Sequence, residues 1–302
     1  MPTIRGTLFL NAKSGPRLPG RQSEALVEAA REGGLEVVPF TRELDVTAVV
    51  RDELRRGRTL FVAAGGDGTV NSVMQGLVQH PEACLGVIPT GTYNHFARDL
   101  GIPLDWREAL DVALSGARRT VDTARVNDRF FVNNVSIGLY AELVARREEK
   151  GRDYPRWKAR LLAAYATFRK YPHVTLAIET AHHQELVRTH VFMVSNNSYE
   201  LSRIGIEASR TLLREGRLSV YWLPHLSRRR LMRFMARYLA GRVRETPGFR
   251  SFRTSGMKVQ SSRPSLKAGV DGEVLALATP VTITIVPQSL EVMVPHSESG
   301  LR

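Results

Sequence analysis

Residues 61–71 read Phe61-Val62-Ala63-Ala64-Gly65-Gly66-Asp67-Gly68-Thr69-Val70-Asn71. An apolar run of strand length ends in closely spaced glycines, and an apolar pattern of helical period follows from Val70. Glycine has no Cβ, so the backbone of such a turn can approach a phosphate closely. The free amides and the dipole of the helix start favour the anion. The stretch therefore predicts a phosphate site formed by Gly65, Gly66, Gly68 and Thr69.

Asp67 inside this turn requires an explanation, because a carboxylate repels phosphate unless a cation lies between them. Magnesium binds carboxylate and phosphate oxygens together, which makes Asp67 a candidate metal ligand. The alternative is a tight turn in which Asp67 only caps the helix, and the spacing alone leaves both open. Two other phosphate motifs are excluded. A Walker A loop needs Gly-Lys-Ser/Thr, and a dinucleotide fingerprint needs Gly or Ala where Asn71 stands.

Two further apolar segments end in residues of the same kind. Segment 4–10 is followed by Asn11-Ala12-Lys13-Ser14-Gly15, and segment 85–89 by Thr90-Gly91-Thr92-Tyr93-Asn94. With strands at 35–40 and 59–64 and helices near 21–32, 45–56 and 69–79, the first part alternates strand and helix. This order predicts a three-layer α/β domain that binds ligands beyond the carboxyl ends of its parallel strands. We expect one anion site there, to which the two further segments contribute Asn11, Ser14, Gly15, Gly91, Thr92 and Asn94.

The pattern changes near residue 120, where segments 121–126 and 129–135 predict a hairpin joined at Asn127-Asp128. Further strands are expected at 173–180, 186–194, 217–223, 256–260, 264–270, 273–278 and 281–286, and helices near 138–149, 155–170 and 227–241. We therefore predict two domains, an α/β domain at 1–122 and a β-rich domain, most simply a sandwich, at 123–302. The last residues, roughly 15 of them, are expected to pack back on the first domain.

Length and composition agree with a two-domain globular protein of 302 residues. The single cysteine, Cys84, rules out an internal disulfide framework and fits a reducing compartment. No segment approaches the roughly 20 apolar residues of a membrane span, so we expect a cytoplasmic protein.

The net charge of +13 is unevenly distributed. Residues 1–122 carry 14 Lys and Arg against 15 Asp and Glu, and residues 123–302 carry 29 against 15. The second part should therefore be attracted to an anionic surface.

Two basic segments in the second part bear on that surface. Segment 227–242 places an apolar stripe on one helical face and arginines on most of the rest, and segment 146–170 has nine basic residues with aromatic residues between them. Such helices can lie at an anionic membrane surface, here the inner face of the membrane, or can pack their stripes on the sandwich. Two of them favour peripheral membrane contact. No nucleic-acid-binding module is recognisable, so we expect no nucleic-acid partner. The sequence predicts no oligomeric state.

The order of the motifs resembles the diacylglycerol kinase catalytic domain family, which includes bacterial lipid kinases, sphingosine kinases and ceramide kinases. The matching segments are Gly65-Gly66-Asp67-Gly68-Thr69, Pro89-x-Gly91-Thr92-x-Asn94-x-Phe96-Ala97-Arg98, Asn133-x-x-Ser136-x-Gly138-x-x-Ala141, Glu215-Gly216-Arg217-Leu218 and Asp271-Gly272-Glu273. The first is shared with NAD kinases, whereas the second is characteristic of the lipid kinases. The matches span residues 11 to 273.

This resemblance implies a nucleotide domain, a C-terminal β-sandwich and an active-site cleft between them, with ATP and Mg²⁺ as cofactors. Asp271 would act as the base for the acceptor hydroxyl, Asp67 would join it in catalysis, and Glu273 would contact the nucleotide. Asp67 and Asp122 would belong to a metal-linked carboxylate network. The expected activity is transfer of the γ-phosphoryl group to a lipid hydroxyl, with diacylglycerol as the first candidate. Without the resemblance, Asp271-Gly272 indicates only a hairpin turn.

The chain departs from the family pattern at several positions. His95 stands where many relatives carry Asp, Tyr140 replaces a common Asp, and Ala12 replaces Pro. A neutral histidine is a poor magnesium ligand, so the metal arrangement is open. Two alternatives follow: an NAD-kinase-like enzyme acting on a soluble nucleotide, and a non-catalytic protein that binds nucleotide or lipid.

Overall fold

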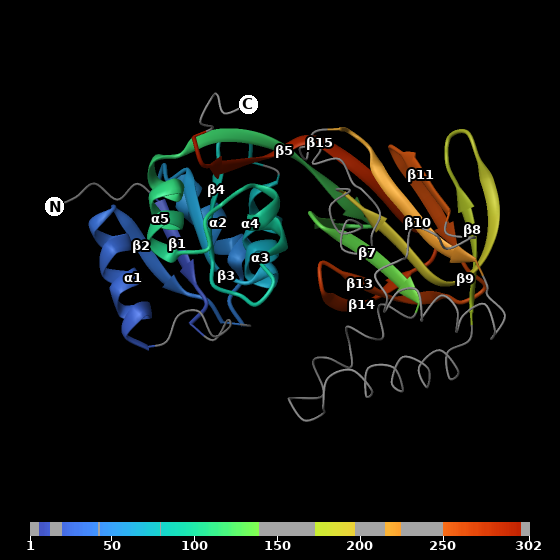
Figure 1. The fold of residues 1–302 in the computed structure, drawn as a ribbon, viewed down its shortest axis with the longest axis horizontal. Helices are drawn as coiled ribbons and strands as arrows, with labels where there is room; N and C mark the ends of the chain where they lie inside the picture. Colours follow the sequence, from blue (N-terminus) through green and yellow to red (C-terminus); the bar gives the residue numbers. More distant parts are fainter. Residues whose placement is uncertain are drawn as a thin grey trace, which may run out of the picture. The chain divides into compact units, whose positions relative to one another are not determined.

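The computed structural model describes residues 6–12, 20–41, 43–78, 80–138, 173–196, 215–224 and 250–296. The chain divides into two compact units (Figure 1). The first unit runs to Thr123 and resumes at Pro287, and the second comprises Ala124–Val286. The two boundaries fall inside strands β5, Ala117–Val126, and β15, Val281–Val294, so each of these strands belongs to both units.

A parallel sheet in the order β2-β1-β3-β4 forms the centre of the first unit. Its strands are β1 Gly6–Leu10, β2 Leu35–Pro39, β3 Leu60–Gly65 and β4 Cys84–Pro89. Ala64 of β3 lies opposite both Leu10 and Ile88. The residues that follow β1, β3 and β4 therefore share one edge of the sheet. β15 extends the sheet beside β4 through Glu291 and Val292.

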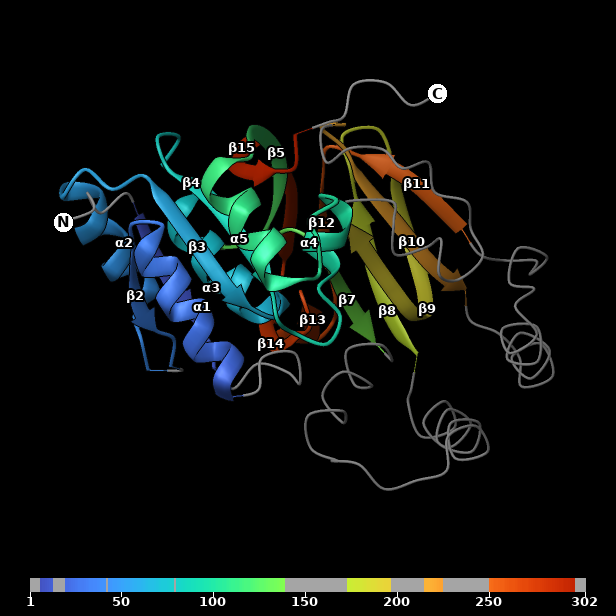
Figure 2. The same ribbon diagram turned by 60° about the vertical axis from the view of Figure 1, so that its left-hand side comes forward.

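Five helices are described in this unit, and they cover both faces of the sheet (Figure 2). They are α1 Gly20–Glu32, α2 Val46–Arg55, α3 Asp67–Leu77, α4 His95–Asp99 and α5 Trp106–Ser115. The β1-α1-β2 and β3-α3-β4 connections run in opposite directions along the sheet, so right-handed crossovers place α1 and α3 on opposite faces. In agreement, α1 packs with α5, and α2 packs with α3.

The apolar spacing of the sequence explains how these helices pack. Val70, Val73, Met74 and Leu77 bury one face of α3, as the helical period predicts. Side-chain carboxylates cap the N-termini of two other helices, α2 and α5. Asp45 accepts from the amide of Ala48, and Asp105 accepts from the amides of Arg107 and Glu108.

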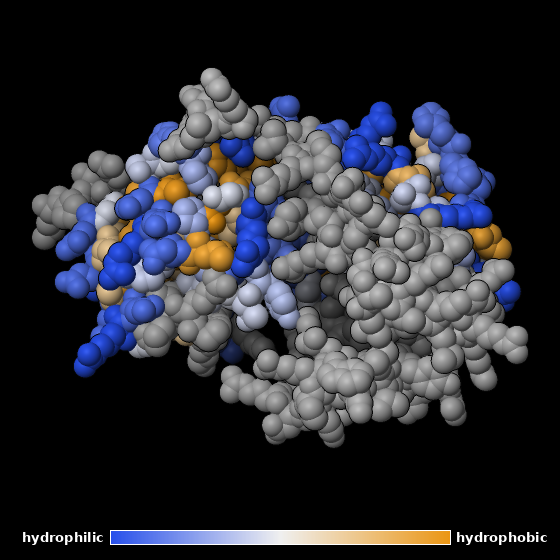
Figure 3. All heavy atoms as spheres, in the orientation of Figure 1, coloured by the Kyte–Doolittle hydropathy of each residue, from blue (hydrophilic) through white to orange (hydrophobic). Residues whose placement is uncertain are grey.

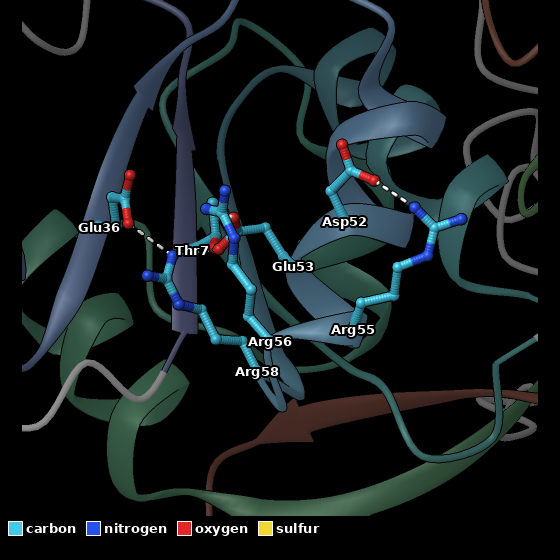
Figure 4. A network of polar contacts seen from close by, with 7 residues as sticks. All are labelled: Thr7, Glu36, Asp52, Glu53, Arg55, Arg56 and Arg58. Atoms are coloured by element: carbon cyan, nitrogen blue, oxygen red, sulfur yellow. Dashed lines mark hydrogen bonds and ion pairs between the residues drawn. The ribbon is translucent and has the colours of Figure 1, made fainter.

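An ion-pair network lies near the amino ends of β1 and β2 (Figure 4). Glu53 of α2 is only 5% exposed, and its carboxylate accepts hydrogen bonds from Arg58, from Arg56 and from the Thr7 hydroxyl at 2.9 Å. Arg58 also pairs with Glu36 at 2.5 Å. The network joins α2 to β1 and β2 at the edge opposite the glycine turn, because Thr7 and Glu36 lie near the starts of their strands.

The second unit is built from antiparallel strands around one apolar core. They are β6 Arg129–Phe131, β7 Asn134–Gly138, β8 Val174–Glu179, β9 Gln184–Ser195, β10 Leu218–Pro224, β11 Arg250–Thr254, β12 Gly256–Gln260, β13 Ser265–Val270 and β14 Glu273–Ala278. The first half of β9 pairs with β8, and its second half pairs with both β7 and β10. Buried aromatic and branched side chains fill the core, among them Phe131, Leu176, Phe192, Val220 and Trp222.

The structure corrects several predicted elements. The segment expected as one strand at 129–135 is two strands, β6 and β7, separated by a loop at Val132 and Asn133. Helices α4 and α5 and strand β11 were not predicted, and β15 continues to Val294 instead of ending at residue 286. The first residue of the helix expected at 138–149, Gly138, is instead the last residue of β7. The rest of that helix and the helices expected at 155–170 and 227–241 lie outside the described residues.

Candidate functional site

The glycine turn after β3 leads directly into α3, as predicted. Gly66 precedes the helix in an extended conformation, and its carbonyl accepts the first helical hydrogen bond from Val70 at 3.1 Å. The N-cap residue is a glycine and has no side chain with which to cap this end of α3. The first amides of a helix have no partner within the helix, and the dipole adds partial positive charge there. The turn thus has the local structure of an anion site.

Close packing, against a side chain at one position and against backbone at the other, explains two of the glycines. A Cβ on Gly65 would lie 2.3 Å from the Thr69 hydroxyl oxygen, and a Cβ on Gly91 would lie 2.4 Å from the Cα of Gly66. The loops after β3 and β4 therefore touch through glycine backbone. The amide of Thr90 also donates to the carbonyl of Gly65 at 3.0 Å. The structure brings these two predicted segments together.

Asn94 fixes the loop after β4 from within. Its backbone is left-handed, with φ 51°, and its side-chain Nδ2 donates to the carbonyls of Gly91 at 2.8 Å and Pro89 at 3.3 Å. Asn94 is buried, and no described group donates to its Oδ1. This carboxamide oxygen lies against Gly91, where it would be 2.9 Å from an added Cβ. Thr92, in contrast, is exposed.

Asp67 connects the two loops through α4. Its Oδ1 accepts a long hydrogen bond, 3.4 Å, from the amide of Phe96 in the first turn of α4, while Asn94 makes no capping bond with its own side chain. Asp67 is half-buried. Its carboxylate therefore contributes to the start of a neighbouring helix, which resembles the capping role that the sequence left open. Its magnesium role stays a prediction.

Asn11 completes the described part of this edge. Its amide donates to the carbonyl of Ala64 at 2.9 Å, and its Nδ2 donates to the Thr69 hydroxyl at 3.0 Å. The predicted nucleotide contacts Ser14 and Gly15 lie outside the described residues. Asn11 thus holds the side chain of Thr69 beside the glycine turn.

Asp122, the second predicted metal ligand, is buried in β5. Its Oδ1 accepts from the amide of Gln288 at 2.9 Å, at a point where β15 has a left-handed residue with φ 48°. This contact helps to hold β15 against β5. Within the described residues there is no cluster of three or more His, Cys, Asp or Glu side chains that would hold a metal ion.

His95 replaces the acidic residue of the family pattern and stacks on Tyr93. The two rings are nearly parallel, with an interplanar angle of 4° and centroids 5.6 Å apart. Tyr93 is an exposed aromatic residue, at 42%. The pair places an aromatic surface on the loop after β4. Tyr140, the other departure, lies outside the described residues.

A cavity of about 320 Å³ adjoins the same loop. It is lined by Gln22, Pro89, Thr90, Leu104, Asp105, Trp106 and Arg107, and the Arg107 guanidinium stacks over the Trp106 ring at 4.3 Å. It shares Pro89 and Thr90 with the glycine loop of β4, but the glycines themselves do not line it.

Asp271, in the second unit, occupies a two-residue hairpin turn between β13 and β14. Val270 pairs with Glu273, and φ is positive at both Asp271 and Gly272, 47° and 91°. Positive φ at both positions is the requirement of a type I′ turn. The hairpin turn that Asp271-Gly272 indicated is therefore present. The Asp271 carboxylate makes further contacts that the turn does not require.

Three backbone amides donate to the Asp271 carboxylate. Val132 donates to Oδ2 at 2.9 Å, and Asn133 and Asn134 donate to Oδ1 at 2.9 and 3.0 Å. Asp271 is only 7% exposed. Amide donors stabilise a carboxylate in its charged form. This side chain is therefore a fixed anion and hydrogen-bond acceptor, and it anchors the loop between β6 and β7.

Glu273, predicted to contact the nucleotide, forms an ion pair with Arg129 of β6. Both side chains are about one-third to two-fifths exposed, at 41% and 33%. The sequence reasoning did not single out Arg129 or the loop at Val132. The Asn133-x-x-Ser136 match pointed to this region. However, the loop at Val132 and Asn133 is held by Asp271, which is distant in the chain.

The comparisons with known proteins place this geometry in a family. The model of the diacylglycerol kinase catalytic domain matches residues 5–126, and the model of the YegS C-terminal NAD kinase beta sandwich-like domain matches residues 133–294. The chain belongs to the family that joins these two domains. The predicted family and fold class, an α/β domain followed by a β-sandwich, are thereby confirmed.

Individual relatives match a little under half of the chain. The chain is 32% identical over 142 residues to a protein named diacylglycerol kinase from Staphylococcus carnosus, covering 46% of each chain. It is 38% identical over 138 residues to "Probable lipid kinase YegS-like" from Pectobacterium atrosepticum, covering 44% of this chain and 46% of the relative. The chain thus spans about half the length of the curated relatives that it matches.

Solved structures agree in fold over nearly the whole chain. A crystal structure of a diacylglycerol kinase from Bacillus anthracis str. Sterne has a TM-score of 0.67 at 18% identity and covers 97% of this chain and 98% of its own. A second structure from the same organism has a TM-score of 0.72 at 19% identity, with the same coverage. At this level of identity, the likeness concerns the fold.

Proposed function

We propose that the protein is an ATP-dependent lipid kinase, which transfers the γ-phosphoryl group of ATP to a lipid hydroxyl. The main support is the contact between the glycine loops of β3 and β4 beside the start of α3, which has a glycine at its N-cap, in a chain of this family. Oδ1 of Asn94, which has no hydrogen-bond partner among the described residues, would add a polar contact at the same loops. Diacylglycerol is the first acceptor to test, because relatives carry that name.

In this proposal the first unit binds the nucleotide. The amides of Gly66, Asp67 and Gly68 would receive phosphate oxygens, Asn11 and Thr69 would support the turn, and Thr92 would contribute a hydroxyl. Thr92 is exposed and Asp67 is half-buried, so both side chains can be reached by a ligand. Ser14 and Gly15 remain predicted contacts in this binding role.

The donor set tests the predicted magnesium only in part. Mg²⁺ keeps several waters and binds through one or two carboxylates together with phosphate, so the Asp67 carboxylate fits it. Asp122 fits less well, because it is buried and accepts from the Gln288 amide. When bound, the ion would neutralise charge on the phosphates.

Asp271 would orient the acceptor hydroxyl. Phosphoryl transfer depends mainly on positioning and charge neutralisation, so a fixed hydrogen-bond acceptor is sufficient, and a strong base is not required. The three amide bonds of Asp271 hold that acceptor in one place. Glu273, with Arg129 as its ion-pair partner, remains a proposed nucleotide contact.

Contact with an anionic membrane surface is a separate part of the proposal. The described residues on the face in Figure 3 are mainly hydrophilic, with smaller hydrophobic areas between them. Tyr93 and Leu186 are the large apolar side chains exposed among the described residues, and no described helix meets the length and hydropathy of a membrane span. The basic segments 146–170 and 227–242 lie outside them. Co-sedimentation with anionic and with neutral vesicles at two salt concentrations tests the contact.

A lipid panel tests the proposed reaction. Purified protein is incubated with γ-labelled ATP, Mg²⁺ or Mn²⁺, and mixed micelles of diacylglycerol, monoacylglycerol, ceramide or sphingosine, with NAD as a separate acceptor. The proposal expects a labelled lipid. Label in NAD would favour the soluble-nucleotide alternative, and tight ATP binding without transfer to any acceptor would favour the non-catalytic one.

A further inference from the structure

The loop between β6 and β7 is held by side chains on both sides. Besides the three amides that donate to Asp271, the carbonyl of Asn134 accepts from the amide of Asp271 at 2.9 Å. The carbonyl of Asn133 accepts from the Ser195 hydroxyl and from the amide of Asn196, both at 3.0 Å. The carbonyl of Val132 accepts from Nδ2 of Asn196 at 3.3 Å. The position of the Asn133 backbone is therefore set by β9 and by the β13–β14 turn.

The side-chain oxygen of Asn133 takes no part in these contacts. Asn133 is 4% exposed, and its Oδ1 has no hydrogen-bond partner among the residues that the structure describes. Nearly all buried polar atoms in native proteins have a partner, and an exception indicates a role such as contact with water or ligand. Since the amide of Asn133 bonds to the Asp271 carboxylate, this oxygen belongs to a residue in direct contact with the proposed acceptor site.

The chemistry of the two side chains defines what they can bind. A carboxylate and a carboxamide oxygen both accept hydrogen bonds, so a ligand that satisfies both must bring two donors. Both residues are almost fully buried, so the groups that reach them must be small, such as hydroxyls on an otherwise apolar molecule. The negative charge of Asp271 disfavours an anionic headgroup at the same place.

We propose that Asn133 is a positioning residue that accepts a hydrogen bond from a second hydroxyl or N–H of the acceptor, next to the hydroxyl that is phosphorylated. This inference rests on the proposed lipid kinase activity and deepens it. The preferred acceptors are lipids with two neighbouring donors, of the monoacylglycerol or sphingoid type. Diacylglycerol, which has one free hydroxyl, is then a poorer acceptor.

Two acceptors that differ by one hydroxyl test this inference on the unmodified protein. 1-Octanoylglycerol has a hydroxyl beside its primary alcohol, and the mono-octanoyl ester of 1,3-propanediol lacks it. Wild-type protein should phosphorylate the glycerol ester with a kcat/KM roughly five- to ten-fold higher, the worth of one hydrogen bond. Asn133→Ala should lower this ratio to about one, a loss of the same fold-change. Asn133→Ser, which keeps an acceptor oxygen, should restore part of it.

Control variants and a stability readout separate this role from a structural one. Gln260→Ala removes an exposed amide of β12 in the same unit and should keep the wild-type ratio. Melting temperatures are measured for every variant. Equal kcat/KM for the two acceptors in wild-type protein overturns the inference, as does an unchanged ratio in folded Asn133→Ala. If Asn133→Ala does not fold, the wild-type comparison decides. Failure to phosphorylate any lipid would instead refute the proposed function.

Discussion

Replacing Asp271 by Asn changes the charge of one buried side chain and leaves its backbone turn intact. Asn-Gly is among the preferred pairs for a type I′ turn, so the left-handed conformation at residue 271 is retained. The oxygen of the amide can still accept from Asn133 and Asn134. The amino group, however, faces the amide of Val132, so that two donors oppose each other where Oδ2 accepted at 2.9 Å.

The size of the effect follows from these contacts. A hydrogen bond to a charged group contributes about 1.5–3 kcal/mol, and a buried donor left without a partner costs about 1–3 kcal/mol. One such bond is lost in Asp271→Asn, and two are weakened because the charge is removed. We therefore expect the free energy of unfolding of the second unit to fall by about 3 kcal/mol.

Urea unfolding of wild-type and variant protein measures this change, with the fluorescence of the buried Trp222 as a reporter in the second unit. Glu273→Gln is the matched control two residues away. Its partner Arg129 and Glu273 itself are both partly exposed, so removing this ion pair should cost less than about 1 kcal/mol. If Asp271→Asn shifts the urea midpoint no more than Glu273→Gln does, the amide contacts of Asp271 do not stabilise the fold as argued.

Three further outcomes are expected. Gly91→Ala should destabilise the first unit by about 1–3 kcal/mol, because the new Cβ would overlap the Gly66 backbone. The same variant should bind ATP more weakly in titration calorimetry, and unchanged affinity would contradict the packing of the two loops. Glu53→Gln should cost about 1.5–3 kcal/mol in urea unfolding, because it removes one of the two carboxylates that pair with Arg58, the other being Glu36. Asp52→Asn on the exposed face of α2 should cost about 0–1 kcal/mol, and equal costs for the two variants would contradict the network. Burial raises the pKa of the Cys84 thiol to about 12, so iodoacetamide at pH 8 should label it only in unfolded protein, and labelling at the same rate in folded protein would contradict its burial.

The raised pKa of the Cys84 thiol also makes the stability of the fold depend on pH. The pKa of the Cys84 thiol in the folded state lies above its ordinary value of 9.0, so the unfolded state loses its proton first as the pH rises. This group therefore contributes stability at neutral pH that is lost progressively between about pH 9 and pH 12.

The sequence was sufficient for the features that depend on local pattern. Strands β1 to β4 and helices α1 to α3 follow from apolar period and glycine turns, and the sheet topology brings their loops to one edge as expected. Helix α5 carried a readable signal as well, since Asp105 caps it and Trp106, Ala109, Leu110 and Ala113 share its buried face. That signal was overlooked.

Other features depend on contacts between distant residues. Asp271 receives the amide of Val132 from 139 positions away, so its place in a polar network is invisible in its own neighbourhood. The predicted end of the last strand at residue 286 was reasonable because Pro287 usually interrupts a strand. In the structure, β15 continues past it through a left-handed Gln288 whose amide bonds to Asp122. Pairing of Glu291 and Val292 with β4 then keeps the chain extended as a strand beyond Pro287.

Transfer of the γ-phosphoryl group tests the central proposal most directly. The protein is incubated in parallel with ATP labelled in the α-phosphate and in the γ-phosphate, with Mg²⁺ and micelles of monoacylglycerol or diacylglycerol, and the lipid is extracted and separated. The account predicts label in the lipid from γ-labelled ATP alone, with more in monoacylglycerol than in diacylglycerol. If neither nucleotide gives labelled lipid, and urea titration shows that the protein is folded, the proposed lipid kinase activity is contradicted.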